Sequence, residues 1–483
     1  MAASSDSQMG QTTFTQTNLV SDGSVPALQI DSNLINPWGV SHSPTSPFWI
    51  SDNGTGLASI DSVSGQNVTL NGVPPVTVAP ASPDAGPAAP TGQVFNAFQA
   101  NDAFTLQDGK PATFLFATED GTISGWNPGA GSQSLIAVNE SQNPADGSEA
   151  LGLGAVYKGL AIADTDQGPM LYAANFRHGT VDMFDQNFNA VGSFTDPNLP
   201  AGFAPFNVQV LDNKLFVTFA KQDDAKHDDV AGSGNGFVDE FNLSGQLLDR
   251  VASGGPLNSP WGMTIAPDSF GKFGGDLLVG NFGDGTIDAF DPNNFKFEGQ
   301  LLGSDGKPIA IQDLWALTPG NGGSAGDPNT IYFTAGLQDE QHGLFGSLTP
   351  NSPTSSTVAA NSGATSSMMG AANSGSTPSN SPIGSTMAAN SGAAMSNSQI
   401  SSTMGATQNS PTSSTMQMGA ADFGSMMPNS QTSSTMGAAN SGSMAPNSPI
   451  GSAMPASSGA VMSNSQTSSM MVAANQMNPP SGY

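Results

Sequence analysis

The sequence of 483 residues contains no cysteine, which excludes disulfide bonds, thiolate zinc sites and cysteine nucleophiles. Basic residues are also scarce, because 10 Lys and Arg stand against 38 Asp and Glu, and the formal net charge is −28. Proteins that bind nucleic acids through phosphates, or that dock on anionic membranes, need a basic face. No apolar run approaches the roughly 18–20 residues that cross a membrane as a helix. The sequence therefore predicts neither an electrostatic nucleic-acid binder nor a membrane span.

The N-terminal sequence shows no recognisable leader. Residues 1–10 contain neither a basic segment nor an apolar one, and a secretory signal peptide needs both in that order. We therefore expect no signal peptide in this chain.

Composition divides the chain at about residue 350. All Lys, Arg, His and Trp lie before this point, together with every acidic residue except Asp422. Residues 351–483 contain 16 of the 21 Met in a background of Ser, Asn, Ala, Thr and Gly. Such a segment has too little branched and aromatic surface to offset the entropy lost on folding. We expect a disordered tail, and its low charge and polar character suit self-association between chains.

The first 350 residues consist of a repeated unit. Apolar and polar residues alternate over short runs separated by Gly, Pro, Asn and Asp, which is typical of β-strands. A turn with glycine recurs at intervals of 67, 58, 57, 49 and 58 residues, at Gly54, Gly121, Gly179, Gly236, Gly285 and Gly343. Six such units, each with three clear strands and a weaker outer one, predict a six-bladed β-propeller. Two separate sandwiches are the alternative, but the even phasing of the units argues against them.

The repeat also predicts how the ring closes. The last unit ends near Pro350 without a fourth strand, whereas residues 13–20 alternate and precede the first unit. Pairing of these two segments removes the open edges of the sheet. We therefore predict a flexible N-terminus over residues 1–12, an all-β propeller over 13–350 with its closing strand at 13–20, and the tail over 351–483.

Several long strings carry a family resemblance. They are residues 36–39 (NPWG), 117–128 (ATEDGTISGWNP), 193–200 (SFTDPNLP), 220–223 (AKQD), 226–230 (KHDDV) and 279–285 (VGNFGDG). Through these strings, the stretch from Asn18 to about Leu348 resembles an uncharacterised, mainly bacterial family of NHL-like six-bladed β-propeller proteins. The resemblance implies the fold and an extracellular or cell-surface location. It implies no activity, because none is established for that family, and the tail lies outside the family pattern.

One end of the propeller is the predicted ligand site. The start of each innermost strand and the turn between the second and third strands lie at the same end of the axis in this fold. This phase predicts a ligand-binding rim formed by Trp38, Tyr157, Phe206, Trp261 and Trp315. It brings the acidic turn residues Asp120, Asp284, Asp339 and Glu340 to the same end. Aromatic rings at these positions either stack on a flat ligand such as a sugar or fill the wedge between blades.

The same end is the predicted place for a cation. Carboxylates and amide oxygens suit Ca²⁺, which takes six to eight oxygen ligands, and an acidic insertion lies at residues 222–229. The candidate ligands are Asn53, Glu119, Asn175, Asp223, Asp224, Asp228, Asp229 and Asn281. Imidazoles suit transition metals, so an alternative metal site consists of His178, His227 and His342. The simpler interpretations are a solvated acidic loop and separate histidines, since the insertion matches no EF-hand spacing.

Three functions fit these features, because propellers host many unrelated activities. The first is a non-enzymatic recognition or scaffold propeller, monomeric itself, that binds a protein or a carbohydrate at this end and carries a tail for tethering or assembly. The second is a Ca²⁺-dependent hydrolase, since gluconolactonase-type propellers are similar in the repeat positions of Asn53, Glu119, Asn175 and Asn281. In that reaction Glu119 would be a ligand or a base. The third is a surface or matrix component.

Overall fold

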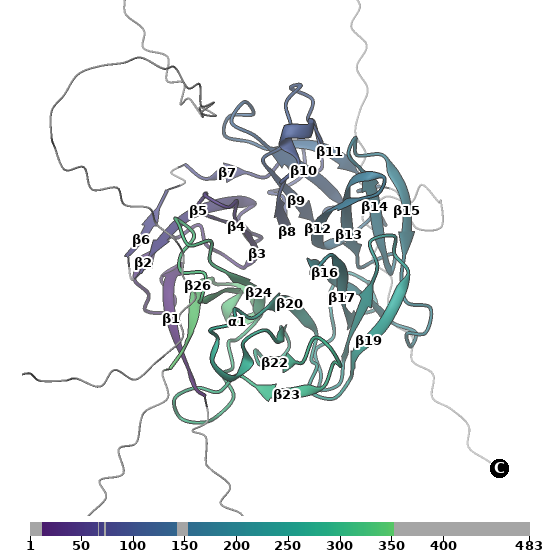
Figure 1. Ribbon diagram of the computed structural model, residues 1–483. Coiled ribbons are helices and arrows are strands. Elements are labelled where there is room, and N and C mark those ends of the chain that lie inside the picture. Colours follow the sequence, from purple (N-terminus) through teal and green to yellow (C-terminus); the bar gives the residue numbers. More distant parts are fainter. Residues whose placement is uncertain (1–11, 66, 72–73, 143–152, 352–483) are drawn as a thin grey trace, which may run out of the picture. The chain divides into compact units, whose positions relative to one another are not determined.

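The computed structural model describes residues 12–65, 67–71, 74–142 and 153–351. The predicted flexible N-terminus and disordered tail lie outside this description, apart from Thr12 and Asn351. The described chain is nearly all β, and its strands form six sheets arranged around a common axis (Figure 1). The predicted six-bladed β-propeller is confirmed.

Blades two to five are antiparallel sheets whose four strands follow one another from the axis outward, and blades one and six vary this pattern at their outer edges. Blade one contains β3 (Pro37–Ser41), β4 (Phe48–Asp52), β5 (Leu57–Ser64), β6 (Asn67–Leu70) and β7 (Val76–Thr77), and blade two contains β8 (Pro90–Phe95), β9 (Phe114–Thr118), β10 (Thr122–Trp126) and β11 (Leu135–Asn139). Blade three contains β12 (Tyr157–Thr165), β13 (Gly168–Asn175), β14 (Thr180–Asp185) and β15 (Ala190–Phe194), and blade four contains β16 (Phe203–Leu211), β17 (Lys214–Lys221), β18 (Gly236–Phe241) and β19 (Leu247–Ser253). Blade five contains β20 (Pro260–Ile265), β21 (Leu277–Asn281), β22 (Ile287–Phe290) and β23 (Phe297–Gln300), and blade six contains β24 (Leu314–Pro319), β25 (Ile331–Ala335) and β26 (Leu344–Pro350). The helical elements are the short turns η1 (Gln99–Asn101), η2 (Gly271–Phe273) and α1 (Leu337–Glu340).

The N-terminal strand completes blade six. β1 (Phe14–Ser21) pairs antiparallel with β26, with Phe14 opposite Pro350 and Ser21 opposite Leu344. The two-residue strand β2 (Gln29–Ile30) adds to its outer edge in parallel. The two ends of the described chain are thus joined in one sheet, and this pairing closes the ring.

The hydrophobic core lies between neighbouring blades. Leu115 and Ile123 of blade two, for example, pack in one cluster with Leu160 and Leu171 of blade three. Because each sheet is covered on both faces, β9 is buried at all five positions, whereas outer strands such as β15 are largely exposed. This burial of apolar surface is the main source of stability for such a sheet.

The innermost strands approach each other closely near the axis. A Cβ atom on Gly39 would collide with the carbonyl oxygen of Thr91 in the next blade. A Cβ atom on Gly262 would collide in the same way with the carbonyl oxygen of Trp315. Glycine is needed at these two positions because backbones meet there.

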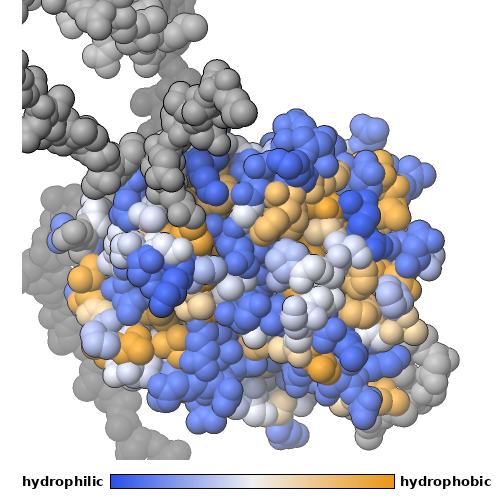
Figure 2. Space-filling view, turned by 90° about the horizontal axis from the view of Figure 1, so that it is seen from below, coloured by the Kyte–Doolittle hydropathy of each residue, from blue (hydrophilic) through white to orange (hydrophobic). Residues whose placement is uncertain are grey.

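The outer surface is mixed in character. On the side shown in Figure 2, hydrophilic and hydrophobic residues are interspersed. Large exposed hydrophobic residues include Ile30, Val191, Leu248 and Phe297, which lie on the outer strands β2, β15, β19 and β23. Single side chains of this kind are normal on protein surfaces. In the part of the chain that is described, no helix has the length and apolar character that crossing a membrane requires.

Candidate functional site

Aromatic side chains fill the propeller axis. Trp38 stacks on Trp315 with ring centroids 3.4 Å apart, and Trp261 meets both rings edge-on at 6.0 and 5.8 Å. Phe206 of blade four contacts Trp38 of blade one, so the rings meet across the axis. The three Trp side chains are at most 2 % exposed. We call this cluster the aromatic plug, and it consists of Trp38, Phe176, Phe206, Trp261, Phe282 and Trp315. Four of the five rings predicted to form the ligand rim, those of Trp38, Phe206, Trp261 and Trp315, are therefore buried in one cluster.

The three Trp residues of the plug occupy equivalent places on innermost strands. Trp38, Trp261 and Trp315 are each the second residue of their strand, β3, β20 and β24. The second residue of β12 is Lys158. Tyr157 precedes it, and a shift of one residue turns a side chain to the opposite face of a strand. Tyr157 is consequently buried between blades two and three. Lys158 lies next to the plug, at the position that was predicted for Tyr157.

Lys158 is a buried cation on one side of the plug. Its side chain is 1 % exposed, and its Nζ donates to Glu119 Oε1 and, at 3.1 Å, to Asp228 Oδ1. The same Nζ lies 4.9 Å from the ring centroid of Trp38 and 5.9 Å from that of Phe176, within the range of cation–π attraction. Burial lowers the pKa of Lys158, but the charges of Glu119 and Asp228 outweigh it, and the net shift is upward. Lys158 thus remains an ammonium ion.

A chain of hydrogen bonds extends from this ion pair around the axis. Asn53, which follows β4, donates to Glu119 Oε2 at 2.9 Å. Asn36, which precedes β3, donates to Asn53 Oδ1 at 3.2 Å and to Glu340 Oε2 at 2.6 Å. The indole N–H of Trp315 donates to Asn36 Oδ1 at 3.0 Å, which anchors the chain to the plug. We call this end of the axis the mouth and define the mouth network as Asn36, Asn53, Glu119, Lys158, His227, Asp228 and Glu340. Its members come from blades one, two, three, four and six.

Glu340 is held at the mouth by a strained turn. Gln338, Asp339 and Glu340 of α1 have positive φ values of 57°, 55° and 64°. This left-handed conformation costs about 1–2 kcal/mol per non-glycine residue, and such strain clusters at functional sites. Burial of the Glu340 carboxyl and the nearby charge of Glu119 raise its pKa to about 7. The ammonium of Lys158 therefore does not neutralise all the negative charge of the network.

The acidic insertion between β17 and β18 contributes His227 and Asp228. Asp223 Oδ1 accepts the backbone N–H groups of both residues, at 2.8 and 3.3 Å, and so shapes the loop. His227 Nδ1 lies 2.9 Å from Asp228 Oδ1. The hydrogen bond from His227 and the charge of Lys158 hold the pKa of Asp228 well below its usual range, and the same hydrogen bond raises the pKa of His227. Asp224 is exposed, and burial raises the pKa of Asp229.

Two residues predicted as Ca²⁺ ligands form hydrogen bonds within their own blades instead. Asn175 donates to Asp182 Oδ2 and Asn281 donates to Asp288 Oδ2, each at 2.8 Å within one sheet. Their side-chain oxygens accept backbone N–H groups from the segments before β12 and β20. Both asparagines brace a turn, and neither joins Glu119.

The alternative set of three histidines does not converge. His178 Nδ1 lies 3.1 Å from Asn175, and His342 Nδ1 lies 2.5 Å from Asp22 Oδ2. His227 is paired with Asp228. In the described ranges, no two of these histidines belong to one group of neighbouring metal-ligand atoms.

The residues at the mouth do not fit a Ca²⁺ site. Ligand atoms of Glu119, His227 and Asp228 lie within 4.8 Å of one another. Lys158 Nζ, however, already contacts both carboxylates, and Ca²⁺ requires six to eight oxygen ligands. The ammonium stands where a metal ion would have to lie, so no metal chemistry follows from this arrangement.

Two residues that carry the mouth network, Lys158 and Asn36, are absent from the sequence-based candidates. Lysine is rarely fully buried, which argues against placing it on the axis. A signal is nevertheless present, because Lys158 precedes Gly159 just as Trp38 precedes Gly39 and Trp261 precedes Gly262. For the side-chain hydrogen bonds of Asn36 the sequence holds no comparable signal.

The fold and the site together define a six-bladed β-propeller with an ion-pair network over an aromatic plug. No protein-family model matches the chain. It is 32 % identical over 349 residues to "Uncharacterized protein R648" of Acanthamoeba polyphaga mimivirus, covering 70 % of this chain and 80 % of that protein. It is also 32 % identical over 339 residues to "Uncharacterized protein L690" of the same virus, covering 68 % and 84 %. The chain belongs to the family of these mimivirus proteins, and this corrects the expectation of a mainly bacterial family.

Solved structures with distant similarity include two enzymes. The soluble aldose sugar dehydrogenase of Escherichia coli is 13 % identical, with a TM-score of 0.42. The match covers 70 % of this chain and 100 % of the dehydrogenase chain. A gluconolactonase from Xanthomonas campestris is 14 % identical, with a TM-score of 0.32. The match covers 55 % of this chain and 90 % of the gluconolactonase chain. Similarity at this level carries no information about ligand or reaction.

Proposed function

We propose that this chain is a non-enzymatic recognition propeller whose mouth binds a protein partner through a cationic side chain. The observation that carries the proposal is the charge balance of the mouth network. Three carboxylates, those of Glu119, Asp228 and Glu340, are held around a single ammonium ion. His227, which pairs with Asp228, adds a positive charge only when its imidazole is protonated. A second cation, supplied by a partner, would balance the remaining negative charge.

Preorganisation supports binding at this place. The carboxylates are fixed by hydrogen bonds from Asn36 and Asn53 and by a strained turn, so little ordering is needed when a partner arrives. The formal net charge of −28 would also speed the approach of a basic partner. A guanidinium group suits the site because it donates several hydrogen bonds in one plane.

The hydrogen bonds of Glu119 fit a role in recognition better than a role in hydrolysis. Its Oε1 accepts from Lys158 and its Oε2 accepts from Asn53. A general base or metal ligand needs an oxygen that is free to take a proton or a cation. In this proposal residues 351–483 tether or assemble the propeller, for which their low charge and polar composition are the support.

A matched pair of peptides tests the proposal. Tetra-arginine and tetra-citrulline have nearly the same shape, but only the first is charged. We expect isothermal titration calorimetry with the full chain at pH 8 to show binding of tetra-arginine and at least about tenfold weaker binding of tetra-citrulline. Binding of tetra-arginine should weaken from pH 8 to pH 5.5, because Glu340, with a pKa of about 7, takes up a proton over this range.

Two variants locate the effect. Glu340→Gln should weaken tetra-arginine binding by about tenfold. The control Glu298→Gln removes the same charge from β23, where Glu298 pairs with the exposed Lys296, and should change the affinity less than about twofold. Equal binding of the two peptides, or equal loss in the two variants, would refute the proposal.

A further inference from the structure

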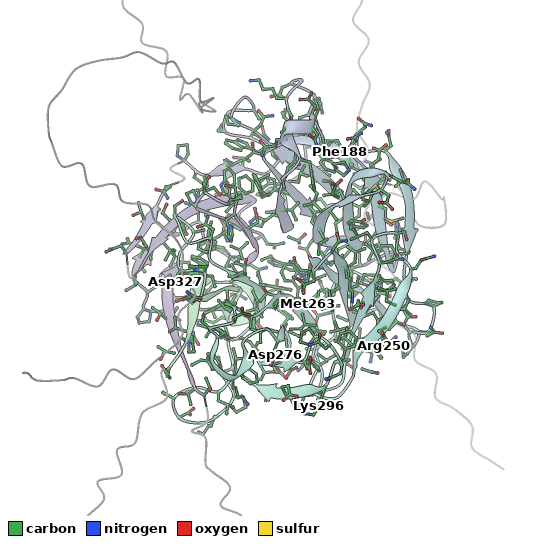
Figure 3. The ribbon with its side chains drawn as sticks, viewed as in Figure 1. Phe188, Arg250, Met263, Asp276, Lys296 and Asp327 are labelled. Carbon is green, nitrogen blue, oxygen red and sulfur yellow. The ribbon has the colours of Figure 1, made fainter. Side chains whose placement is uncertain are left out.

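A cavity occupies the axis on the other side of the aromatic plug. Its volume is about 520 Å³, and all six innermost strands line it, from β3 to β24. Trp261 of the plug forms part of the cavity wall. Met263 also borders the cavity and lies near the axis (Figure 3). Small-molecule sites in proteins usually have volumes of about 300–1,000 Å³. The cavity therefore has the size of a binding site and is separated from the mouth by the plug.

The cavity wall contains polar atoms that lack partners. Among the described residues, Gln93 Oε1, Trp261 Nε1 and Ser41 Oγ have no hydrogen bond. Gln93 and Trp261 are only 6 % and 2 % exposed. The orientation of the Gln93 amide is fixed, because its Nε2 donates to the carbonyl oxygens of Gly39 and Trp49 at 2.8 and 2.6 Å. Each of the three atoms has less than 1 Å² of accessible surface. The polar side chains that an occupant of the cavity can reach are therefore others on the wall, such as the partly exposed Gln209 and Thr318.

The lining is nearly free of charge. Of the described residues around the cavity, two are ionisable, His42 and Asp212. His42 already lies within hydrogen-bond distance of the carbonyl oxygens of Ser43 and Pro319. Partly exposed apolar residues such as Val40 and Val210 form part of the remaining wall. In a protein with a net charge of −28, this lining selects an uncharged occupant.

We infer that this cavity binds a neutral sugar, a monosaccharide or disaccharide, that enters from the end of the axis opposite to the mouth. A hydroxyl group both donates and accepts, so sugar hydroxyls can pair with the partly exposed amide of Gln209 and hydroxyl of Thr318. The C–H face of a sugar ring packs on apolar and aromatic side chains such as the partly exposed Val40 and Phe95. The innermost strands pair on one side only, and their other edges supply further backbone donors and acceptors toward the axis.

The test is titration calorimetry of the full chain with a panel of sugars. The neutral members are glucose, galactose, mannose, N-acetylglucosamine and maltose, and the charged members are glucuronate and glucosamine. At least one neutral sugar should bind saturably with a Kd below about 1 mM, and the charged sugars at least about tenfold more weakly. If no neutral sugar of the panel binds, the cavity holds water only and the inference is wrong.

Paired substitutions at one position locate the site. Ser41→Phe fills the cavity and should weaken sugar binding more than about tenfold, whereas Ser41→Ala keeps the space, removes a hydroxyl that an occupant does not reach, and should change binding less than about twofold. Gln209→Phe fills the cavity from blade four and should repeat the loss if Ser41→Phe does not fold. Sugar binding unchanged in a folded filling variant would overturn the inference. Glu340→Gln should leave it unchanged, so failure at the mouth and failure here remain distinguishable.

Discussion

At the scale of single residues, Lys158 is a buried cation that two carboxylates hold in place. Desolvation of an ammonium ion costs several kcal/mol, and an ion pair offsets that cost only when both partners stay in place. Glu119 is 12 % exposed, so removal of Lys158 leaves its carboxylate buried without a counter-charge. Asp228 is 63 % exposed, and water solvates it in either case. The stability at stake therefore lies mainly in the pair of Lys158 and Glu119.

We expect Lys158→Met to lower the free energy of unfolding by about 3–5 kcal/mol at pH 8. The double variant Lys158→Met with Glu119→Gln should recover most of the loss, since neither charge is left. Urea unfolding of the four proteins forms a double-mutant cycle that measures the coupling.

The control for this cycle is Lys296→Met, which removes an exposed lysine paired with Glu298. Surface ion pairs contribute about 0–1 kcal/mol, so this variant should be nearly as stable as the parent protein. If Lys158→Met costs no more than Lys296→Met, the buried ion pair does not stabilise the fold.

At the scale of structural elements, the closing strand β1 decides whether the ring is continuous. Its backbone pairs with β26 along seven residue pairs, and its first residue, Phe14, is 1 % exposed. The Phe14 ring packs on Phe270 and Phe273, with centroids 4.8 and 6.1 Å apart. One side chain of β1 thus ties blade six to blade five.

Phe14→Ala should lower the free energy of unfolding by about 3–5 kcal/mol, the usual range for a buried Phe. The matched control is Val191→Ala on β15, where the side chain is 52 % exposed and the expected change is below about 0.5 kcal/mol. Thermal and urea unfolding measure both variants. Equal stability of the two would mean that the closing strand contributes little.

The arrangement of blades is readable in the sequence because it depends on local patterns. Turn glycines such as Gly121 and Gly285 mark each unit, and both adopt the positive φ that favours glycine, 79° and 74°. Alternation over residues 13–20 indicates a strand without a partner in its own unit, and β1 (Phe14–Ser21) begins and ends one residue later. Such signals depend only on residues that are close in the sequence, so they can be recognised without knowledge of the tertiary structure.

The site is less readable because it depends on register and on long-range contacts. Tyr157 and Lys158 are adjacent, and only the exact register of β12 decides which one faces the axis. Asn36 and Glu340 are 304 residues apart, and their hydrogen bond follows from ring closure. Asn175 has the residue type of a metal ligand, yet it bonds within its own blade. Residue type alone cannot separate these cases.

At the scale of the whole molecule, buried carboxyl groups link stability to pH. Burial raises the pKa of Asp61 and Asp239 to about 7 and that of Asp288 to about 6, and burial with the charge of Glu119 raises that of Glu340 to about 7. In the unfolded chain these groups titrate near 3.8 to 4.5. Between about pH 4 and pH 7 the folded state therefore binds more protons, and the free energy of unfolding falls as the pH rises.

We expect the melting temperature in 0.5 M NaCl to be higher at pH 5 than at pH 8 by at least about 5 °C, since each pKa unit corresponds to about 1.4 kcal/mol. High salt screens repulsion between surface carboxylates, so a difference that persists reports on the buried groups. Glu340→Gln keeps an oxygen that accepts from Asn36, and it should raise the melting temperature at pH 8 with little effect at pH 5. Scanning calorimetry measures both. A melting temperature that rises from pH 5 to pH 8 in high salt would contradict the raised pKa values, because buried carboxylates can stabilise the folded state at high pH only when their pKa values are lowered.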